Sequence, residues 1–227
     1  MNEKEAIQEA VKAARGNASA QHNLAFMYNN GTGVTKDYKQ AFKWYTKSAE
    51  QGNARAQFNL GVMYDYGEGV TKDYKQAIKW FTKSAEQGQV DAQYILGLMY
   101  EKGKSVTQDY KQAIKWYTKS AEQGDARAQC NLGYMYDKGK GVTQDYKQAF
   151  KWYTKSAEQG GATQDYKQAI KWFTKSAEQG YATAQYNLAL MYDNGEGVTQ
   201  DYKQAFKWLT KSAEQGHDWA KNSLESI

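Results

Sequence analysis

The stretch NARAQFNLGVMYDYGEGVTKDYKQAIKWFTKSAEQG, residues 53–88, contains two helical patterns separated by a glycine turn. The first pattern ends at Gly67. The second opens with Asp73, and Gln76 follows three residues later, which is the spacing of a capping box. Gly88 then supplies the left-handed conformation with which helices commonly end. The stretch therefore predicts an antiparallel helical hairpin.

Each of the two predicted helices has one apolar side, since successive side chains turn by about 100° around a helix. In the second helix this side consists of Tyr74, Ala77, Ile78, Trp80, Phe81, Ser84 and Ala85. In the first helix it consists of Ala56, Leu60, Gly61, Met63 and Tyr64. Only a small residue at position 61 lets two helix axes approach closely. One hairpin cannot bury its own apolar side, so several must stack in a row.

The hairpin is one copy of an internal repeat, marked by the dipeptide Asp-Tyr. The dipeptide recurs at Asp37, Asp73, Asp109, Asp145, Asp165 and Asp201, so that its intervals are 36, 36, 36, 20 and 36 residues. The short interval lacks a first helix and its glycine turn, which brings two second-type helices into direct succession. A second-type helix does not fit the slot of a first helix. We therefore expect a register break, a bend or a sub-domain boundary near residues 160–161.

These intervals predict an all-α chain with repeated hairpins between two capping helices. The expected parts are an N-terminal capping helix at 1–16, four repeats at 17–160, a truncated repeat with only its second helix at 161–180, a fifth full repeat at 181–216 and a C-terminal capping helix at 217–227.

The composition excludes several kinds of site. The single cysteine, Cys130, excludes an intramolecular disulfide framework and a cysteine-based zinc site, and the two histidines make a histidine-based metal centre unexpected. We expect no cofactor. No apolar run approaches the roughly 20 residues that cross a bilayer. No signal peptide is visible, so we expect a cytoplasmic location for the chain as given, or a periplasmic or secreted one if a signal peptide was removed.

The repeated motifs are Ala-x-Ala-Gln-x-x-Leu-Gly-x-Met-Tyr, Gly-x-Gly-Val, Asp-Tyr-x-x-Ala-x-x-Trp and Ala-Glu-x-Gly. Together they closely resemble the Sel-one-like repeat (SLR) family, a relative of the tetratricopeptide repeat (TPR), over residues 17–216. The resemblance implies an α-solenoid, a right-handed superhelix of antiparallel hairpins that acts as an adaptor in protein complexes. Ser105 in place of a turn glycine and the short interval depart from the family pattern.

The second helices are nearly identical, whereas the first helices vary at four places. The varying sets are Ser19, Arg55, Asp91, Arg127 and Thr183; His22, Phe58, Tyr94, Cys130 and Tyr186; Phe26, Val62, Leu98, Tyr134 and Leu190; and the pairs Asn29–Asn30, Asp65–Tyr66, Glu101–Lys102, Asp137–Lys138 and Asp193–Asn194. Their spacing places all of them on one side of the helix. In a TPR-like stack the first helix lines the concave surface, so this side would face a groove.

We interpret the variable side as a recognition groove for a protein or peptide, in which apolar side chains form pockets and charges select the partner. The predicted partner-binding residues are Arg55, Phe58, Val62, Tyr66, Asp91, Tyr94, Leu98, Arg127, Cys130, Tyr134, Tyr186 and Leu190. Neutral drift at exposed positions is the alternative, but drift normally gives polar residues and two of the four sets are mainly apolar. The nearby asparagines 23, 59, 131 and 187 either bind a peptide backbone or tie helices together.

The remaining function classes find less support. No phosphate-binding loop follows the glycine turns, and Cys130 has no histidine at a recognisable spacing, so we expect no enzyme. Three lysines on each second helix form a convex stripe that could bind acidic polymers weakly, but interleaved Glu, Asp and Gln dilute it, and a nucleic-acid partner is not expected. A homodimer through residues 145–180 is the other alternative, because the lost helix leaves apolar area that a second copy could cover.

Overall fold

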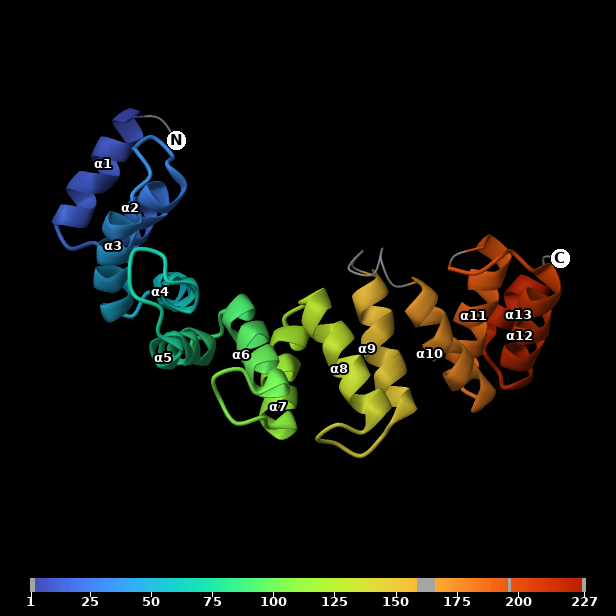
Figure 1. Ribbon diagram of the computed structural model, residues 1–227. Coiled ribbons are helices and arrows are strands. Elements are labelled where there is room, and N and C mark those ends of the chain that lie inside the picture. The colour runs from blue at the N-terminus through green and yellow to red at the C-terminus, as the bar shows by residue number, and fades with distance from the viewer. Residues whose placement is uncertain (1–2, 159–165, 196, 226–227) are drawn as a thin grey trace. The chain divides into compact units, whose positions relative to one another are not determined.

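The computed structural model describes residues 3–158, 166–195 and 197–225. In these ranges the chain forms thirteen helices and no strand, which confirms the all-α prediction (Figure 1). The chain divides into two compact units, Met1–Gln123 and Gly124–Ile227. Each unit is described by itself below.

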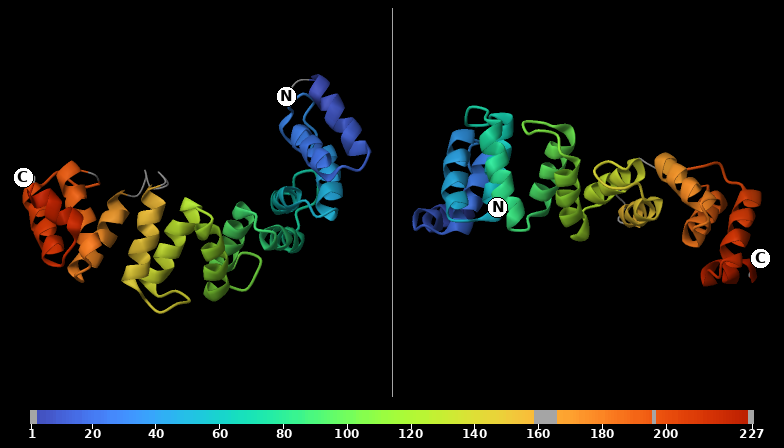
Figure 2. Two further views of the ribbon diagram at one scale, coloured as in Figure 1. Left: turned by 180° about the vertical axis from the view of Figure 1, so that it is seen from behind. Right: turned by 90° about the horizontal axis from the view of Figure 1, so that it is seen from below.

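The helices pack as antiparallel hairpins inside each unit, and successive hairpins lie side by side (Figure 2). The first unit contains α1 (Glu3–Ala14), α2 (Ala18–Asn30), α3 (Tyr38–Glu50), α4 (Ala54–Tyr66), α5 (Tyr74–Glu86), α6 (Val90–Lys102) and α7 (Tyr110–Glu122). The second contains α8 (Ala126–Lys138), α9 (Tyr146–Glu158), α10 (Tyr166–Glu178), α11 (Ala182–Asn194), α12 (Tyr202–Glu214) and α13 (Asp218–Glu225). The helices α2, α4, α6, α8 and α11 are the first helices of their hairpins.

The truncated repeat consists of α10, which packs against both α9 and α11 inside the second unit. The break that we expect at residues 160–161 lies outside the described residues. The division between the two compact units falls elsewhere, at residues 123–124.

The helix ends follow the local sequence. Asp73 caps α5, because its Oδ1 accepts hydrogen bonds from the backbone N–H groups of Lys75 and Gln76 at 2.9 and 3.1 Å. At the other end Gly88 has a φ of 90°. Asn53 caps α4 in the same way, by accepting from the backbone N–H of Ala56 at 2.9 Å. These caps explain why the two helices begin and end where the sequence predicts.

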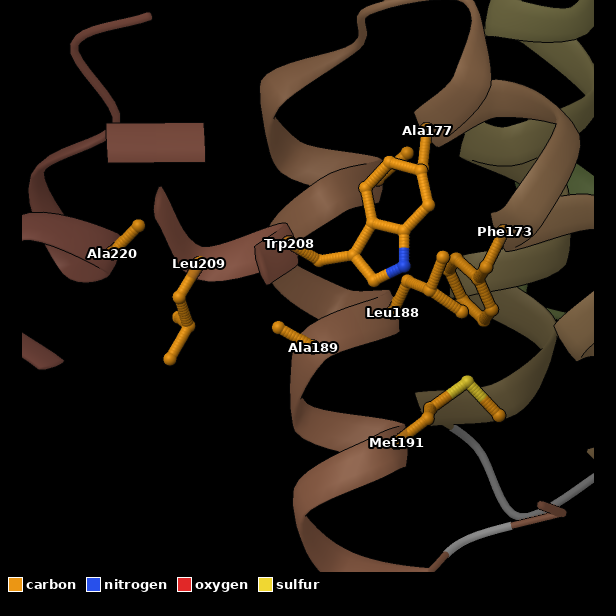
Figure 3. Packing of buried hydrophobic residues seen from close by; sticks show 9 residues of the cluster. Phe173, Ala177, Leu188, Ala189, Met191, Trp208, Leu209 and Ala220 are labelled. Carbon is orange, nitrogen blue, oxygen red and sulfur yellow. The ribbon is translucent and has the colours of Figure 1, made fainter. Parts of the chain in front are cut away.

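A small residue at the centre of each first helix makes room for an aromatic ring of the second helix. A Cβ atom added to the glycine would lie well inside contact distance of that ring. The pairs and distances are Gly61–Phe81 at 2.7 Å, Gly97–Tyr117 at 2.5 Å and Gly133–Tyr153 at 3.0 Å. In the last hairpin Ala189 takes the glycine position and the smaller Leu209 takes the ring position, both in one core cluster (Figure 3). The first hairpin does not follow the pairing of glycine with a ring and of alanine with leucine, since Ala25 shares a core cluster with Tyr45 there.

The tryptophan of a second helix joins its hairpin to the preceding second helix. Trp208 of α12 lies beside Ala177 of α10 and Leu188 of α11, and it is 6% exposed (Figure 3). In the first unit Trp80 belongs to one core cluster with Ala49 of α3. Burial of one large apolar side chain stabilises the fold by about 1.5–3 kcal/mol, so each hairpin depends on its neighbour.

A buried polar network, which the sequence analysis did not predict, adds to this packing. Gln57 Nε2 donates to the backbone carbonyl of Ala49 at 3.1 Å, and Gln87 Nε2 donates to Gln57 Oε1 at 2.7 Å. Ser84 Oγ donates to the carbonyl of Ala54 at 2.7 Å. The same bonds recur at Gln21, Gln93 and Gln185, at Gln51, Gln123 and Gln215, and at Ser48, Ser120, Ser156 and Ser212. The network accounts for the near identity of the Ser-Ala-Glu-Gln-Gly segments.

The close approach of Gly61 to Phe81 predicts a measurable coupling. Gly61→Ala should lower the free energy of unfolding by about 1–2 kcal/mol, because overpacking of the ring outweighs the better helix propensity of alanine. In a Phe81→Leu background the same change should be nearly neutral, as in the natural pair Ala189 and Leu209. A double-mutant cycle followed by urea unfolding measures this coupling, and strictly additive effects would contradict the packing argument.

Candidate functional site

In each unit the variable side chains of the first helices form what we call the first-helix face, which comprises α2, α4 and α6 in the first unit and α8 and α11 in the second. None of the twelve predicted partner-binding residues is fully buried. Arg55, Tyr66 and Arg127 are exposed. The half-buried members are Phe58, Val62, Asp91, Tyr94, Leu98, Cys130, Tyr134, Tyr186 and Leu190.

Several of these half-buried side chains also stabilise the hairpin that carries them. The ring centroid of Phe58 lies 5.7 Å from that of Phe81, and the centroid of Tyr94 lies 6.0 Å from that of Tyr117. Val62 packs against the same core cluster as Phe58. These side chains therefore have one surface in the core and one toward solvent.

Two members of the fourth variable set differ from the expectation that they face a groove. Glu101 and Asp137 are only 8% and 1% exposed. The hydroxyl of Tyr117 donates to Glu101 Oε2 at 2.7 Å, and Lys138 Nζ lies 3.0 Å from Asp137 Oδ2. Sequence spacing alone placed both carboxylates on the variable side, whereas the packing of the second helix against this end of the first helix encloses them.

The structure explains two of the four asparagines, 23, 59, 131 and 187, that lie near the variable side of the first helices. Asn59 Nδ2 lies 3.3 Å from His22 Nε2, which joins α4 to α2. Asn23 Nδ2 donates to Glu9 Oε2 at 3.1 Å, which joins α2 to α1. At these two positions the side chains tie helices together, and a role in binding a peptide backbone stays a prediction for asparagines 131 and 187.

The surroundings of His22 disfavour its charged form. Its Nδ1 lies 3.4 Å from Asn23 Oδ1 and its Nε2 lies 3.3 Å from Asn59 Nδ2, an arrangement that suits a neutral ring with its hydrogen on Nδ1. The ring also packs at 5.7 Å from Tyr45. Burial lowers the pKa of His22 below its usual value and outweighs the hydrogen bond with Asn23, which raises it, while the nearby charge of Arg55 acts in the same direction as burial.

Two of the three lysines in the stripe of the second helices α3, α5, α7, α9 and α12 lie over the tryptophan of the same helix. Lys79 Nζ and Lys83 Nζ lie 5.9 and 4.6 Å from the ring centroid of Trp80. The same pairs flank Trp44, Trp116, Trp152 and Trp208. Cation–π contacts of this kind contribute about 0.5–1 kcal/mol at exposed sites. The repetition of these lysines is therefore explained by packing, without an acidic partner.

Two cavities open beside the first-helix face. One of about 330 Å³ lies between α2 and α4 and is lined by Ser19, His22, Asn23, Asn53, Ala54 and Arg55. The other, of about 360 Å³, lies in the second unit and is lined by Tyr186, Trp219, Asn222 and Ser223. Among the described residues, no cluster of His, Cys, Asp and Glu is suited to hold a metal ion. No described helix is both long and apolar enough to span a membrane.

Comparison with protein families gives one result over almost the entire chain. The Sel1 repeat model matches residues 18–53, 54–89, 90–125, 126–161, 159–181 and 182–217. The short match at 159–181 falls on the truncated repeat. Sel1 repeat proteins generally serve as non-catalytic scaffolds for protein interactions. A search of the curated proteins found no match.

Two solved structures are similar in both sequence and fold. A protective antigen present in uropathogenic Escherichia coli strains, which displays an SLR fold, is 40% identical with a TM-score of 0.68. The match covers 97% of this chain and 50% of the antigen, so this chain spans half the length of that protein. A Sel1 repeat protein from Oxalobacter formigenes is 37% identical with a TM-score of 0.62, and the match covers 94% of this chain and 79% of that one.

The environment of His22 predicts a pH-dependent stability. Since the pKa of His22 is lower in the folded chain, the unfolded chain binds more protons below about pH 6.5, and stability falls as the pH decreases. The slope should reach at most about 1.4 kcal/mol per pH unit. His22→Phe, which places the residue of position 58 there, should remove this slope in urea unfolding between pH 7.5 and 5. Parallel pH profiles for the two proteins would contradict the assignment.

Proposed function

Because this chain belongs to the Sel1 repeat family, we propose that it is a non-catalytic scaffold that binds a protein or peptide along the first-helix face. One observation carries the proposal. Sequence variation among the repeats is concentrated on side chains that are half-buried or exposed, whereas the second helices, which the core and the tryptophan–lysine contacts occupy, are almost invariant.

Aromatic residues on this face are suited to anchor a partner. Tyr66 is 71% exposed, and Phe26 is 46% exposed, although both belong to helices with a well-packed opposite side. Tyrosine is enriched among the residues that contribute most to binding at protein interfaces. Rigid first helices would hold such anchors at fixed positions, which lowers the entropy lost on binding.

Charged side chains on the same face would select the partner. Lys104 Nζ reaches back from the turn after α6 to Asp65 of α4, at 3.1 and 3.2 Å from its two carboxylate oxygens. Exposed ion pairs of this kind add at most about 1 kcal/mol to stability. Their larger effect in an interface is on specificity and on the rate of association.

The proposal is tested by protein capture from the native source with two matched variants. The variant Tyr66→Ala/Tyr94→Ala should capture its partner at least about tenfold less well, because truncating such anchors usually removes more than 1 kcal/mol each. The control Lys75→Ala/Lys111→Ala changes exposed residues of the second helices and should retain capture. Thermal melting of both variants shows that the fold persists. Equal capture by all three proteins would reject binding through the first-helix face.

Self-association through residues 145–180 is a second candidate function. A cavity of about 590 Å³ beside α9 is lined by Phe150 and Tyr181 together with Lys147, Lys151 and Lys155 and others, and a second copy could cover its apolar part. Size-exclusion chromatography with light scattering should then give a mass that rises with concentration. Phe150→Glu should abolish this rise, and a monomer at every concentration would exclude the candidate.

A further inference from the structure

The cavity between α2 and α4 has a polar lining whose only permanent charge is positive. Its described lining residues are Ser19, His22, Asn23, Asn53, Ala54 and Arg55, and no carboxylate is among them. Glu9 of α1 is engaged by Asn23 and by Lys12, whose Nζ lies 3.1 Å from Glu9 Oε1. The α4 helix also begins here, so its positive N-terminal end adds to the potential.

Arg55 and Arg127 occupy the same position in two repeats but have different surroundings. Arg127 Nε donates to Asp125 Oδ1 at 3.1 Å. Burial raises the pKa of Asp125, but the hydrogen bonds from Arg127 and from the backbone N–H of Ala128 outweigh it and hold the pKa below its usual value. Asp125 thus neutralises its arginine while it also caps α8.

At the corresponding place before Arg55 the cap is Asn53, which has no charge. Asn53 Oδ1 accepts from the backbone N–H of Ala56, as Asp125 does from Ala128. In the described part of the chain the Arg55 guanidinium has no hydrogen-bond or ion-pair partner. The helix caps of the two repeats therefore have the same hydrogen-bond geometry but differ in charge. Only the neutral cap, Asn53, leaves its arginine free for an external anion.

We propose that this cavity binds the carboxylate of an aspartate or glutamate side chain of the partner, with Arg55 as its ion-pair donor. The inference rests on the proposed function and gives that partner an acidic residue opposite α4. An arginine pairs with a carboxylate through two parallel N–H donors, and Ser19 and the Asn53 amide supply further donors in the lining. A hydrogen bond to a charged group contributes enough binding free energy that its loss lowers the affinity about tenfold.

The pKa of His22 gives a spectroscopic readout of binding. Its ring packs against Tyr45 of α3, the charge of Arg55 on α4 acts on it, and Glu9 of α1 is held by the neighbouring Asn23. A bound carboxylate would offset the charge of Arg55, which now disfavours the imidazolium. Binding should therefore raise the pKa of His22, as followed by NMR of the imidazole protons.

The experiment selects random dodecapeptides displayed on phage against the full chain and three variants. Asn53→Asp gives Arg55 the internal partner that Arg127 already has, and it preserves the cap because Asp and Asn are equally good N-caps. Arg55→Gln removes the charge, and Arg127→Gln is the matched control. Peptides selected on the wild type and on Arg127→Gln should share an acidic residue at one position. The affinity of these peptides for Asn53→Asp and for Arg55→Gln should be about tenfold lower than for the wild type. Replacing the shared acidic residue of a selected peptide by its amide (Glu by Gln) should lower its affinity for the wild type by the same factor.

The possible failures are distinguishable. In one outcome the selected peptides bind the wild type and lose affinity for Tyr66→Ala/Tyr94→Ala, but they share no acidic residue or bind Asn53→Asp with unchanged affinity. That outcome overturns the carboxylate site while the proposed function stands. If no selected peptide depends on the first-helix face, the proposed function fails and this inference fails with it.

Discussion

The constraint on which this structure depends is that no hairpin buries its own apolar side. Trp80 shares a core cluster with Ala49 of the preceding second helix, and Trp208 lies beside Ala177 in the second unit. The buried glutamines follow the same direction, since Gln57 donates to the preceding hairpin and accepts from its own. Buried polar groups without partners are unfavourable, so a misplaced hairpin would lose hydrogen bonds as well as apolar contacts. Packing and hydrogen bonding therefore select the same register.

This constraint divides the residues of each repeat into two groups. The second helix contacts its own first helix and the adjacent hairpins, and two of its lysines lie over the tryptophan, so most of its positions take part in packing. One side of the first helix keeps a surface toward solvent. Residues there differ among the repeats while the buried small residue and leucine of each first helix stay nearly constant, which is the physical reason that a repeat protein can acquire a partner by altering a few side chains.

Much of the fold and part of the candidate site followed from local sequence. The caps at Asp73 and Gly67, the helix bounds and the small residue at position 61 depend on contacts within one hairpin, and these are encoded by nearby residues. The glutamine network was missed because its partners lie 30 residues apart and a polar residue on a helix normally indicates solvent. The burial of Glu101 was missed for the same reason, since its hydroxyl partner comes from the following helix.

The sequence by itself determined the all-α class, the repeat length, the truncated repeat and the side of the helix on which variation is concentrated. These properties arise from periodicity, and periodicity is visible in a single chain. Only the tertiary structure decided which members of that side are exposed, which carboxylates are enclosed, and that Arg55 lacks the partner that Arg127 has. Exposure and charge pairing depend on which helices meet in space, and helical spacing fixes the direction of a side chain but not its neighbours.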